Sequence, residues 1–108
     1  MLIPVEDTFY HVAVVNDTTD GKYTIELRPH SGAGGGGPVV SFDSYKLAIE
    51  KAEYFAKTCS LAYRHGFQYN ASKGQFIYGK DSNRCIHVAM AIDPEYHSDF
   101  LAMLKAKQ

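Results

Sequence analysis

The stretch that decides the fold is Ser44–His65, SYKLAIEKAEYFAKTCSLAYRH. Its small and apolar residues recur at steps of three and four, which is the spacing of one face of an α-helix. Four of them are alanines: Ala48, Ala52, Ala56 and Ala62. Because such short side chains let a helix axis come close to a sheet, we expect this helix to lie across an apolar sheet face. Asp43 or Ser44 is the expected N-cap, and Gly66 the residue that follows the C-cap.

Two strands are expected before this helix. Phe9–Val15 is rich in β-branched and aromatic side chains, and Lys22–Arg28 alternates apolar with polar residues, as a half-buried strand does. The cluster Asn16–Gly21 between them ends in an Asp-Gly pair, which readily adopts the positive φ angles of a tight turn. These segments predict a hairpin, and Val39–Phe42 predicts a short third strand.

After the helix, a second hairpin is expected from Phe67–Ala71 and Gln75–Gly79, which flank a Ser-Lys-Gly turn. Asp81–Asn83 is expected to form another turn. Cys85–Ile92 is nearly all apolar, which predicts a central strand covered on both faces.

The chain then predicts a final helix over about Pro94–Lys105, because Asp93 suits an N-cap and Pro94 the first helical position. Its expected buried side consists of Tyr96, Phe100, Leu101 and Leu104. The resulting order, β-β-(β)-α-β-β-β-α, predicts one α+β domain over residues 1–108. In it, a mostly antiparallel sheet of about five to six strands is packed by the long helix and the shorter C-terminal helix.

Composition excludes several classes of protein. In 108 residues, 45% are hydrophobic and 21% charged, which is typical of a globular domain. The 11 Lys and Arg against 12 Asp and Glu leave a net charge of −1, so no general attraction to nucleic acid or anionic lipid is expected. No apolar run approaches the roughly 20 residues of a membrane-spanning helix, and residues 1–8 lack the pattern of a signal peptide. We therefore expect a cytoplasmic protein without a membrane partner.

The sequence predicts neither a metal site nor a cofactor. The five histidines are scattered without the local spacing of metal ligands. Cys59 and Cys85 are too far apart for a Cys-x-x-Cys pair, and two cysteines are too few for a disulfide framework. Cys59 lies on the apolar stripe of the helix, where we expect it to pack in the core.

The segment Pro29–Pro38, PHSGAGGGGP, predicts a flexible loop, because glycine gives the backbone its greatest freedom. It matches neither known phosphate-binding glycine motif, since no Gly-Lys-Ser/Thr occurs and the glycines do not open into a helix. Loops on a rigid scaffold often carry recognition. The expected partner-contact residues here are His30, Gly34, Gly35 and Gly36.

Aromatic and basic residues alternate around the second hairpin. Exposed tyrosines beside arginine or lysine suit a protein interface, or base stacking on single-stranded nucleic acid, which the overall charge supports less. Tyr69, Tyr78 and Arg84 are therefore further partner-contact candidates. Phe67 and Phe76 are expected in the core.

Two segments resemble each other: Tyr10-His11-Val12-Ala13 and Ile86-His87-Val88-Ala89. Their spacing is similar to the paired His-x-Thr/Ser strand motifs of two-histidine phosphoesterases. The resemblance implies that His11 and His87 act as general acid and base on a phosphoester. Alanines stand where that family has phosphate-binding hydroxyls, and the alternative interpretation places both histidines on the polar faces of core strands.

The function that the sequence predicts is a small, non-enzymatic binding or regulatory protein that acts through a macromolecular partner, expected to be a protein. The small size and the lack of catalytic motifs suggest an accessory protein of a phage or mobile element, for example an inhibitor of host defence. One alternative is a phosphoester-processing enzyme that uses His11 and His87. The other is a homo-oligomeric subunit, such as a homodimer, formed by an edge strand such as Lys22–Arg28 pairing with its copy.

Overall fold

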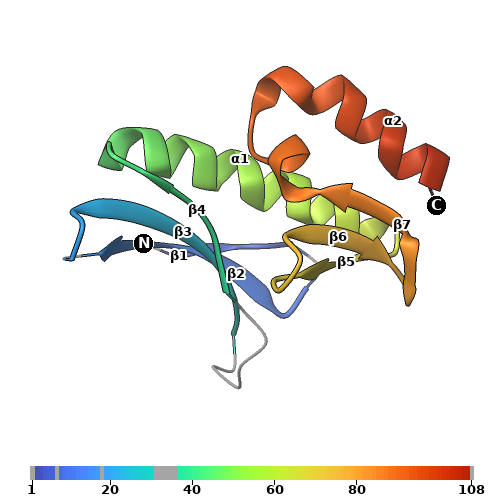
Figure 1. The fold of residues 1–108 in the computed structure, drawn as a ribbon, viewed down its shortest axis with the longest axis horizontal. Helices are drawn as coiled ribbons and strands as arrows, with labels where there is room; N and C mark the ends of the chain where they lie inside the picture. The colour runs from blue at the N-terminus through green and yellow to red at the C-terminus, as the bar shows by residue number, and fades with distance from the viewer. Residues whose placement is uncertain (1, 7, 18, 31–36, 108) are drawn as a thin grey trace.

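A computed structural model describes residues 2–6, 8–17, 19–30 and 37–107 (Figure 1). In these ranges the chain forms two antiparallel sheets, which we call sheet A and sheet B. Sheet A has the order β1-β2-β3-β4, with strands Leu2–Pro4, Tyr10–Asp17, Lys22–Pro29 and Gly37–Phe42. Sheet B has the order β5-β6-β7, with strands Phe67–Asn70, Gln75–Tyr78 and Asp81–His87. The helices are α1 (Tyr45–Arg64) and α2 (His97–Lys107), with 3₁₀ turns η1 (Val88–Ala91) and η2 (Pro94–Tyr96).

The predicted α+β fold, with one long and one short C-terminal helix, is confirmed. The expected five to six strands are refined to seven in the described ranges, and they form two sheets rather than one. Helix α1 separates the two sheets along the chain, because β4 precedes the helix and β5 follows it. None of the described helices is long and apolar enough to cross a bilayer.

Helix α1 begins and ends where the sequence predicts. The Ser44 side chain accepts a hydrogen bond from the backbone N–H of Leu47 (3.3 Å), which makes Ser44 the N-cap. Gly66 follows the C-cap at φ +88°, and a Cβ there would lie 2.9 Å from the Tyr78 ring. Both the backbone angle and the close ring therefore require glycine.

Both helices lie on the same side of the two sheets (Figure 1). Helix α1 contacts all four strands of sheet A as well as β5 of sheet B, and α2 contacts β7. The four alanines of the α1 stripe are buried, as are Cys59 and Phe55. The predicted packing of this stripe against strands is confirmed, and α1 contacts strands of both sheets, while α2 also covers sheet B.

An aromatic cluster fills the core beneath sheet B. In the register of the second hairpin, Phe67 pairs with Tyr78 and Tyr69 with Phe76, so all four side chains lie on one face. Phe67 and Phe76 are fully buried, as predicted, and the two tyrosines are half-buried. The Phe76 ring centroid lies 5.4 Å from Tyr69, 6.1 Å from Phe100 and 6.3 Å from Phe55. Phe76 thus connects sheet B to both helices.

The predicted central strand over Cys85–Ile92 is wrong. Strand β7 begins at Asp81, where a turn was expected, and ends at His87 on the edge of sheet B. The His87 Nδ1 then accepts a hydrogen bond from the N–H of Ala89 (3.1 Å), which caps the turn η1. The Thr58 hydroxyl of α1 donates to the carbonyl of Ala91 (2.6 Å). The apolar run is therefore buried as a helical turn under α1 and not as a pleated strand.

Smaller corrections concern the boundaries of elements. Asn16 and Asp17 belong to β2, which shortens the first turn to the residues just before Lys22. The ends of the predicted glycine loop, Pro29 and Pro38, belong to β3 and β4. Leu2–Pro4 forms a strand that the sequence analysis did not predict, because three residues that end in proline give little pattern.

Two predictions about exposed surfaces are also wrong. Strand β3 lies inside sheet A, between β2 and β4, so Lys22–Arg28 is no free edge for pairing with a second copy. In the C-terminal helix, Phe100 and Leu104 are buried as expected, whereas Tyr96 is 40% exposed. Its η2 turn, capped by Asp93 as predicted, directs this side chain away from the core.

Candidate binding surface

One face of sheet A is left uncovered by the helices (Figure 1). Alternate residues of β2 and β3, such as Val12, Ile25 and Leu27, are buried beneath α1. Because neighbouring side chains of a strand point to opposite faces, the residues between them lie on the other, outer face. In the register of β2 with β3, His11 stands opposite Arg28 on this outer face.

His11 of β2 and His30, which follows β3, form a pair on this face. The Nδ1 atoms of His11 and His30 are 3.2 Å apart, and the rings stack with centroids 5.4 Å apart and planes 12° from parallel. A hydrogen bond at this distance requires one Nδ1 to carry the proton and the other to accept it. The backbone also closes here, since the N–H of His30 donates to the carbonyl of Phe9 (2.7 Å). The structure therefore brings together His11, a candidate catalytic residue, and His30, a candidate partner-contact residue.

Arg28, which stands opposite His11, forms an ion pair with Glu26. Nε and Nη2 of Arg28 both reach Oε1 of Glu26, at 2.6 and 2.5 Å. The pKa of His11 is lowered from its ordinary value, first because burial removes water from the ring, and then because His30 and Arg28 repel its positive form. The lowered pKa favours the neutral form of the His11 ring at pH 7.

The pH dependence follows from this lowered pKa. Below about pH 6.5, the ordinary value, the unfolded chain binds a proton at His11 more readily than the folded one does. The contribution of His11 to stability is thus fully present above that pH and is lost as the pH falls below it. We expect His30→Ala to raise the pKa of His11 toward 6.5, because it removes one repelling ring and part of the cover.

An NMR titration of the His11 ring measures this shift. His97→Ala serves as the control, because the His97 ring lies elsewhere and contacts the Tyr54 hydroxyl (3.0 Å). A His11 midpoint that stays the same in His30→Ala would show that the two rings are not coupled.

Phe9 is the most exposed large hydrophobic side chain of the described residues, at 85%. The other five phenylalanines are buried or half-buried. The turn that carries Phe9 is held on both sides: the Thr8 hydroxyl donates to the carbonyl of Val5 (2.9 Å) and accepts from the N–H of Tyr10 (3.1 Å). The N–H of Val5 donates to the carbonyl of Tyr10 (3.0 Å), and Val5 itself is buried. Phe9 thus projects from a fixed backbone.

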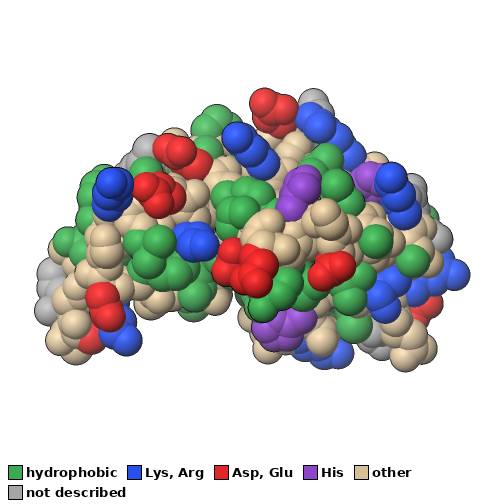
Figure 2. Space-filling view, turned by 90° about the horizontal axis from the view of Figure 1, so that it is seen from above, with side chains coloured by type: hydrophobic (Ala, Val, Ile, Leu, Met, Phe, Trp, Pro, Cys, Tyr) green, Lys and Arg blue, Asp and Glu red, His purple; other side chains and the backbone are tan. Residues whose placement is uncertain are grey.

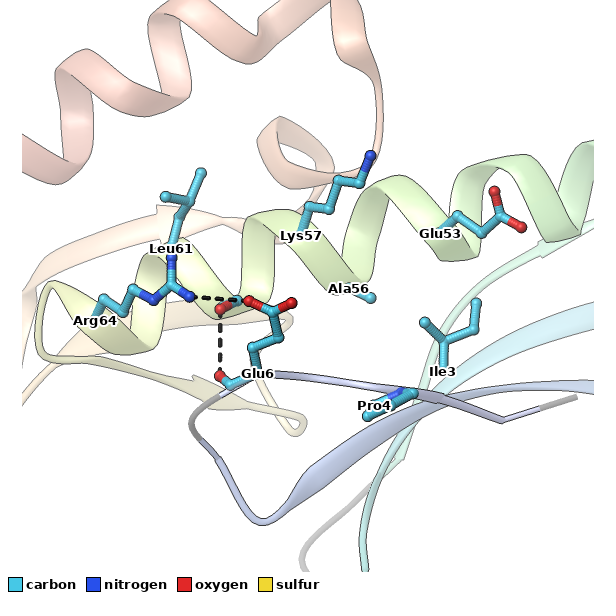
Figure 3. A pocket seen from close by; sticks show the side chains of 9 residues that line it. Ile3, Pro4, Glu6, Glu53, Ala56, Lys57, Leu61 and Arg64 are labelled. Atoms are coloured by element: carbon cyan, nitrogen blue, oxygen red, sulfur yellow. Dashed lines mark hydrogen bonds and ion pairs between the residues drawn. The ribbon is translucent and has the colours of Figure 1, made fainter.

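A hollow of about 500 Å³ lies between β1 and α1 (Figure 3). The Ser60 hydroxyl donates to the carbonyl of Glu6 (3.2 Å), and Nη2 of Arg64 lies 3.1 Å from the Glu6 carboxylate. The hollow combines apolar Ile3 and Leu61 with these charged groups. The contacts of Ser60 and Arg64 with Glu6 hold the connection between β1 and β2, which also carries Phe9, against α1.

The start of β4 brings sheet B close to this end of sheet A. A Cβ on Gly37 would lie 3.1 Å from the Cβ of Ala71, in the turn between β5 and β6. A second hollow of about 480 Å³ lies beside that turn, lined by polar residues that include Asn70, Lys73 and Lys80. The β5–β6 turn of sheet B therefore lies against the start of β4, at the end of sheet A that carries His30.

Of the remaining partner-contact candidates, Tyr69, Tyr78 and Arg84 lie on sheet B. Gly34, Gly35 and Gly36 fall outside the described residues. The Tyr69 ring packs against Phe55 in the core, and burial raises its pKa above the ordinary value.

Tyr78 packs edge-on against Phe67, and the Arg84 guanidinium lies 5.4 Å from the centroid of the Tyr78 ring. Arg84 also approaches the Asp81 carboxylate at 3.5 Å. The rings of Tyr69 and Tyr78 thus pack against core residues on one face. Of these three candidates, Arg84 is the exposed one.

His87, the second residue of the enzyme hypothesis, lies on sheet B, whereas His11 lies on sheet A. The polar contact recorded for each ring is with another group, His30 for His11 and the Ala89 N–H for His87. The predicted acid–base pair stays a prediction.

No cluster of three or more potential metal ligands occurs among the described histidine, cysteine and acidic residues. Cys59 is fully buried, and burial raises the pKa of its thiol well above the ordinary value, which suits a core residue rather than a nucleophile. Comparisons of the chain with protein-family models, with curated proteins and with solved structures found no match.

Proposed function

We propose that the chain is a small, non-enzymatic binding protein that contacts a protein partner through Phe9, His11, Arg28 and His30, which we call the Phe9 patch. The observation that carries the proposal is Phe9, 85% exposed on a turn whose backbone is hydrogen-bonded on both sides. An exposed aromatic side chain on a fixed backbone loses little conformational freedom on binding. It therefore suits the anchor of an interface.

The neighbours of Phe9 favour a protein over a polyanion. Aromatic residues and arginine are enriched in the centres of protein interfaces. Arg28 is already paired with Glu26, so its charge is largely balanced before any partner arrives. On the helix side of the molecule, acidic and basic side chains are interspersed, without a continuous field of one sign (Figure 2). The net charge of −1 adds no attraction to phosphates.

Within this proposal the partner is a host protein, as expected for an accessory protein of a phage or mobile element. Inhibition of a host defence protein requires only that a rigid anchor occupy its surface. The decisive measurement is therefore capture of host proteins by the tagged chain.

We expect Phe9→Asp to abolish capture of a partner that the unchanged protein retains, because a carboxylate cannot enter the pocket of an aromatic anchor. Leu47→Asp is the matched control, since Leu47 is 39% exposed in the first turn of α1. The same partner should be captured by Leu47→Asp as by the unchanged chain. Circular dichroism verifies that both variants are folded.

Two outcomes would overturn this proposal. Equal capture by Phe9→Asp and the unchanged chain would place the interface elsewhere. Self-association that Phe9→Asp abolishes, measured by sedimentation without any other protein, would identify a second copy as the occupant and favour the homodimer.

A further inference from the structure

We propose that His11 and His30 together bind a divalent transition-metal ion, with zinc as the representative, through their two Nδ1 atoms. The carrying observation is that these atoms are 3.2 Å apart on the outer face of sheet A. Two nitrogens that each lie 2.0–2.1 Å from a tetrahedral zinc ion are about 3.4 Å apart. The pair is therefore within about 0.2 Å of the separation that two ligands of one ion require.

The backbone holds both rings in place. His11 lies within β2, opposite Arg28, and His30 follows β3 directly, with its N–H bonded to the carbonyl of Phe9 (2.7 Å). The two side chains are thus diagonal neighbours across paired strands, a spacing at which long side chains meet on one face. The rings stack with planes 12° from parallel, and the lone pair of a ring nitrogen lies in the ring plane, so one ring rotates when both Nδ1 atoms bind the same ion.

The protonation state is also suitable. A metal ligand must be a neutral imidazole with a free lone pair on the coordinating nitrogen. In the hydrogen-bonded pair one Nδ1 carries a proton, and this proton moves to the Nε2 of the same ring when the ion binds. Two neutral rings thus bind the ion without net loss of a proton. Arg28, which stands opposite His11 in the strand register, is paired with Glu26, and this pairing reduces its repulsion of a second positive charge.

The expected ions are those that imidazole prefers, since nitrogen ligands favour zinc, nickel and copper over magnesium. Among the described residues no third histidine, cysteine or acid completes the group. Water is the expected ligand at the remaining positions, which predicts reversible binding rather than a permanent structural ion. The inference does not depend on the proposed partner, because metal binding is measured on the chain alone.

Isothermal titration with zinc chloride at pH 7.5 tests the inference, with magnesium chloride as the hard-cation control. We expect one zinc per chain, and at least tenfold weaker binding by each of His11→Ala and His30→Ala. The matched controls are His87→Ala and His97→Ala, whose rings contact other groups, and both should bind as the unchanged chain does. NMR signals of the two proposed ligand rings should shift together as zinc is added.

Two results would overturn the inference: no saturable binding of zinc by the unchanged chain, or equal binding by the unchanged chain and both ligand variants. Folding is verified independently, because an ion that binds only the native state raises Tm as its concentration rises. That rise should be absent in His11→Ala and His30→Ala, even though both variants unfold cooperatively.

Discussion

Phe76→Ala is expected to lower the free energy of unfolding by about 3–5 kcal/mol. Phe76 is fully buried, and its ring contacts Tyr69 of the neighbouring strand, Phe55 of α1 and Phe100 of α2. Truncation removes the apolar area of the ring and leaves a cavity between three elements that cannot all move inward together. Small domains have a total stability of about 5–15 kcal/mol, so the variant loses a large part of it.

Phe9→Ala is the matched control, because it makes the same chemical change at a side chain that is 85% exposed. Its expected effect is within about 0.5 kcal/mol. Urea unfolding followed by circular dichroism measures both variants. Equal losses from the two substitutions would contradict the position of Phe76 at the centre of the core.

Ala52→Leu is expected to destabilise the protein by about 1–3 kcal/mol. Ala52 is fully buried in the stripe of α1 that packs on the strands. A leucine there adds three carbon atoms where the helix and the sheet are already in contact, so the helix must shift or neighbouring side chains must leave their preferred rotamers.

Ala102→Leu provides the control for this prediction, since Ala102 is exposed on α2 and the substitution leaves helix propensity nearly unchanged. Thermal unfolding of the two variants measures the difference. Equal Tm values for Ala52→Leu and Ala102→Leu would show that the space between α1 and the strands accommodates a larger side chain at position 52.

The elements that the sequence predicted well are those with long, repeated patterns. Helix α1 contains 20 residues, and its periodic stripe, its N-cap at Ser44 and the glycine that follows its C-cap agree with one another. The apolar run that starts at Cys85 carries no such signal, because a short buried strand and a short buried turn show the same uninterrupted apolar residues. The hydrogen bond from the Ala89 N–H to the His87 ring, which ends the strand, is a local capping contact that the apolar pattern does not predict.

The candidate site shows a similar division. His30 was predicted as a contact residue from its place in the glycine-rich segment, but its pairing with His11 depends on the register of the first hairpin. That register depends on the length of the turn before Lys22, and the sequence Asn16–Gly21 is compatible with several turn lengths. Phe9 was predicted as part of a strand, and its exposure follows from the hydrogen bonds of Thr8, which fold the preceding residues into a turn.

The sharing of α1 between both sheets has a consequence for how the molecule opens. The strands of sheet A and sheet B do not pair with each other, so the helix and its side chains are their principal common support. Separation of either sheet from the helix would expose a stripe that belongs to a core shared with the other sheet, which links local unfolding of one half to that of the other. A proteolytic cut or a damaging substitution in one sheet therefore also lowers the stability of the other sheet. This coupling acts through the shared core, because the two sheets have separate ladders of backbone hydrogen bonds.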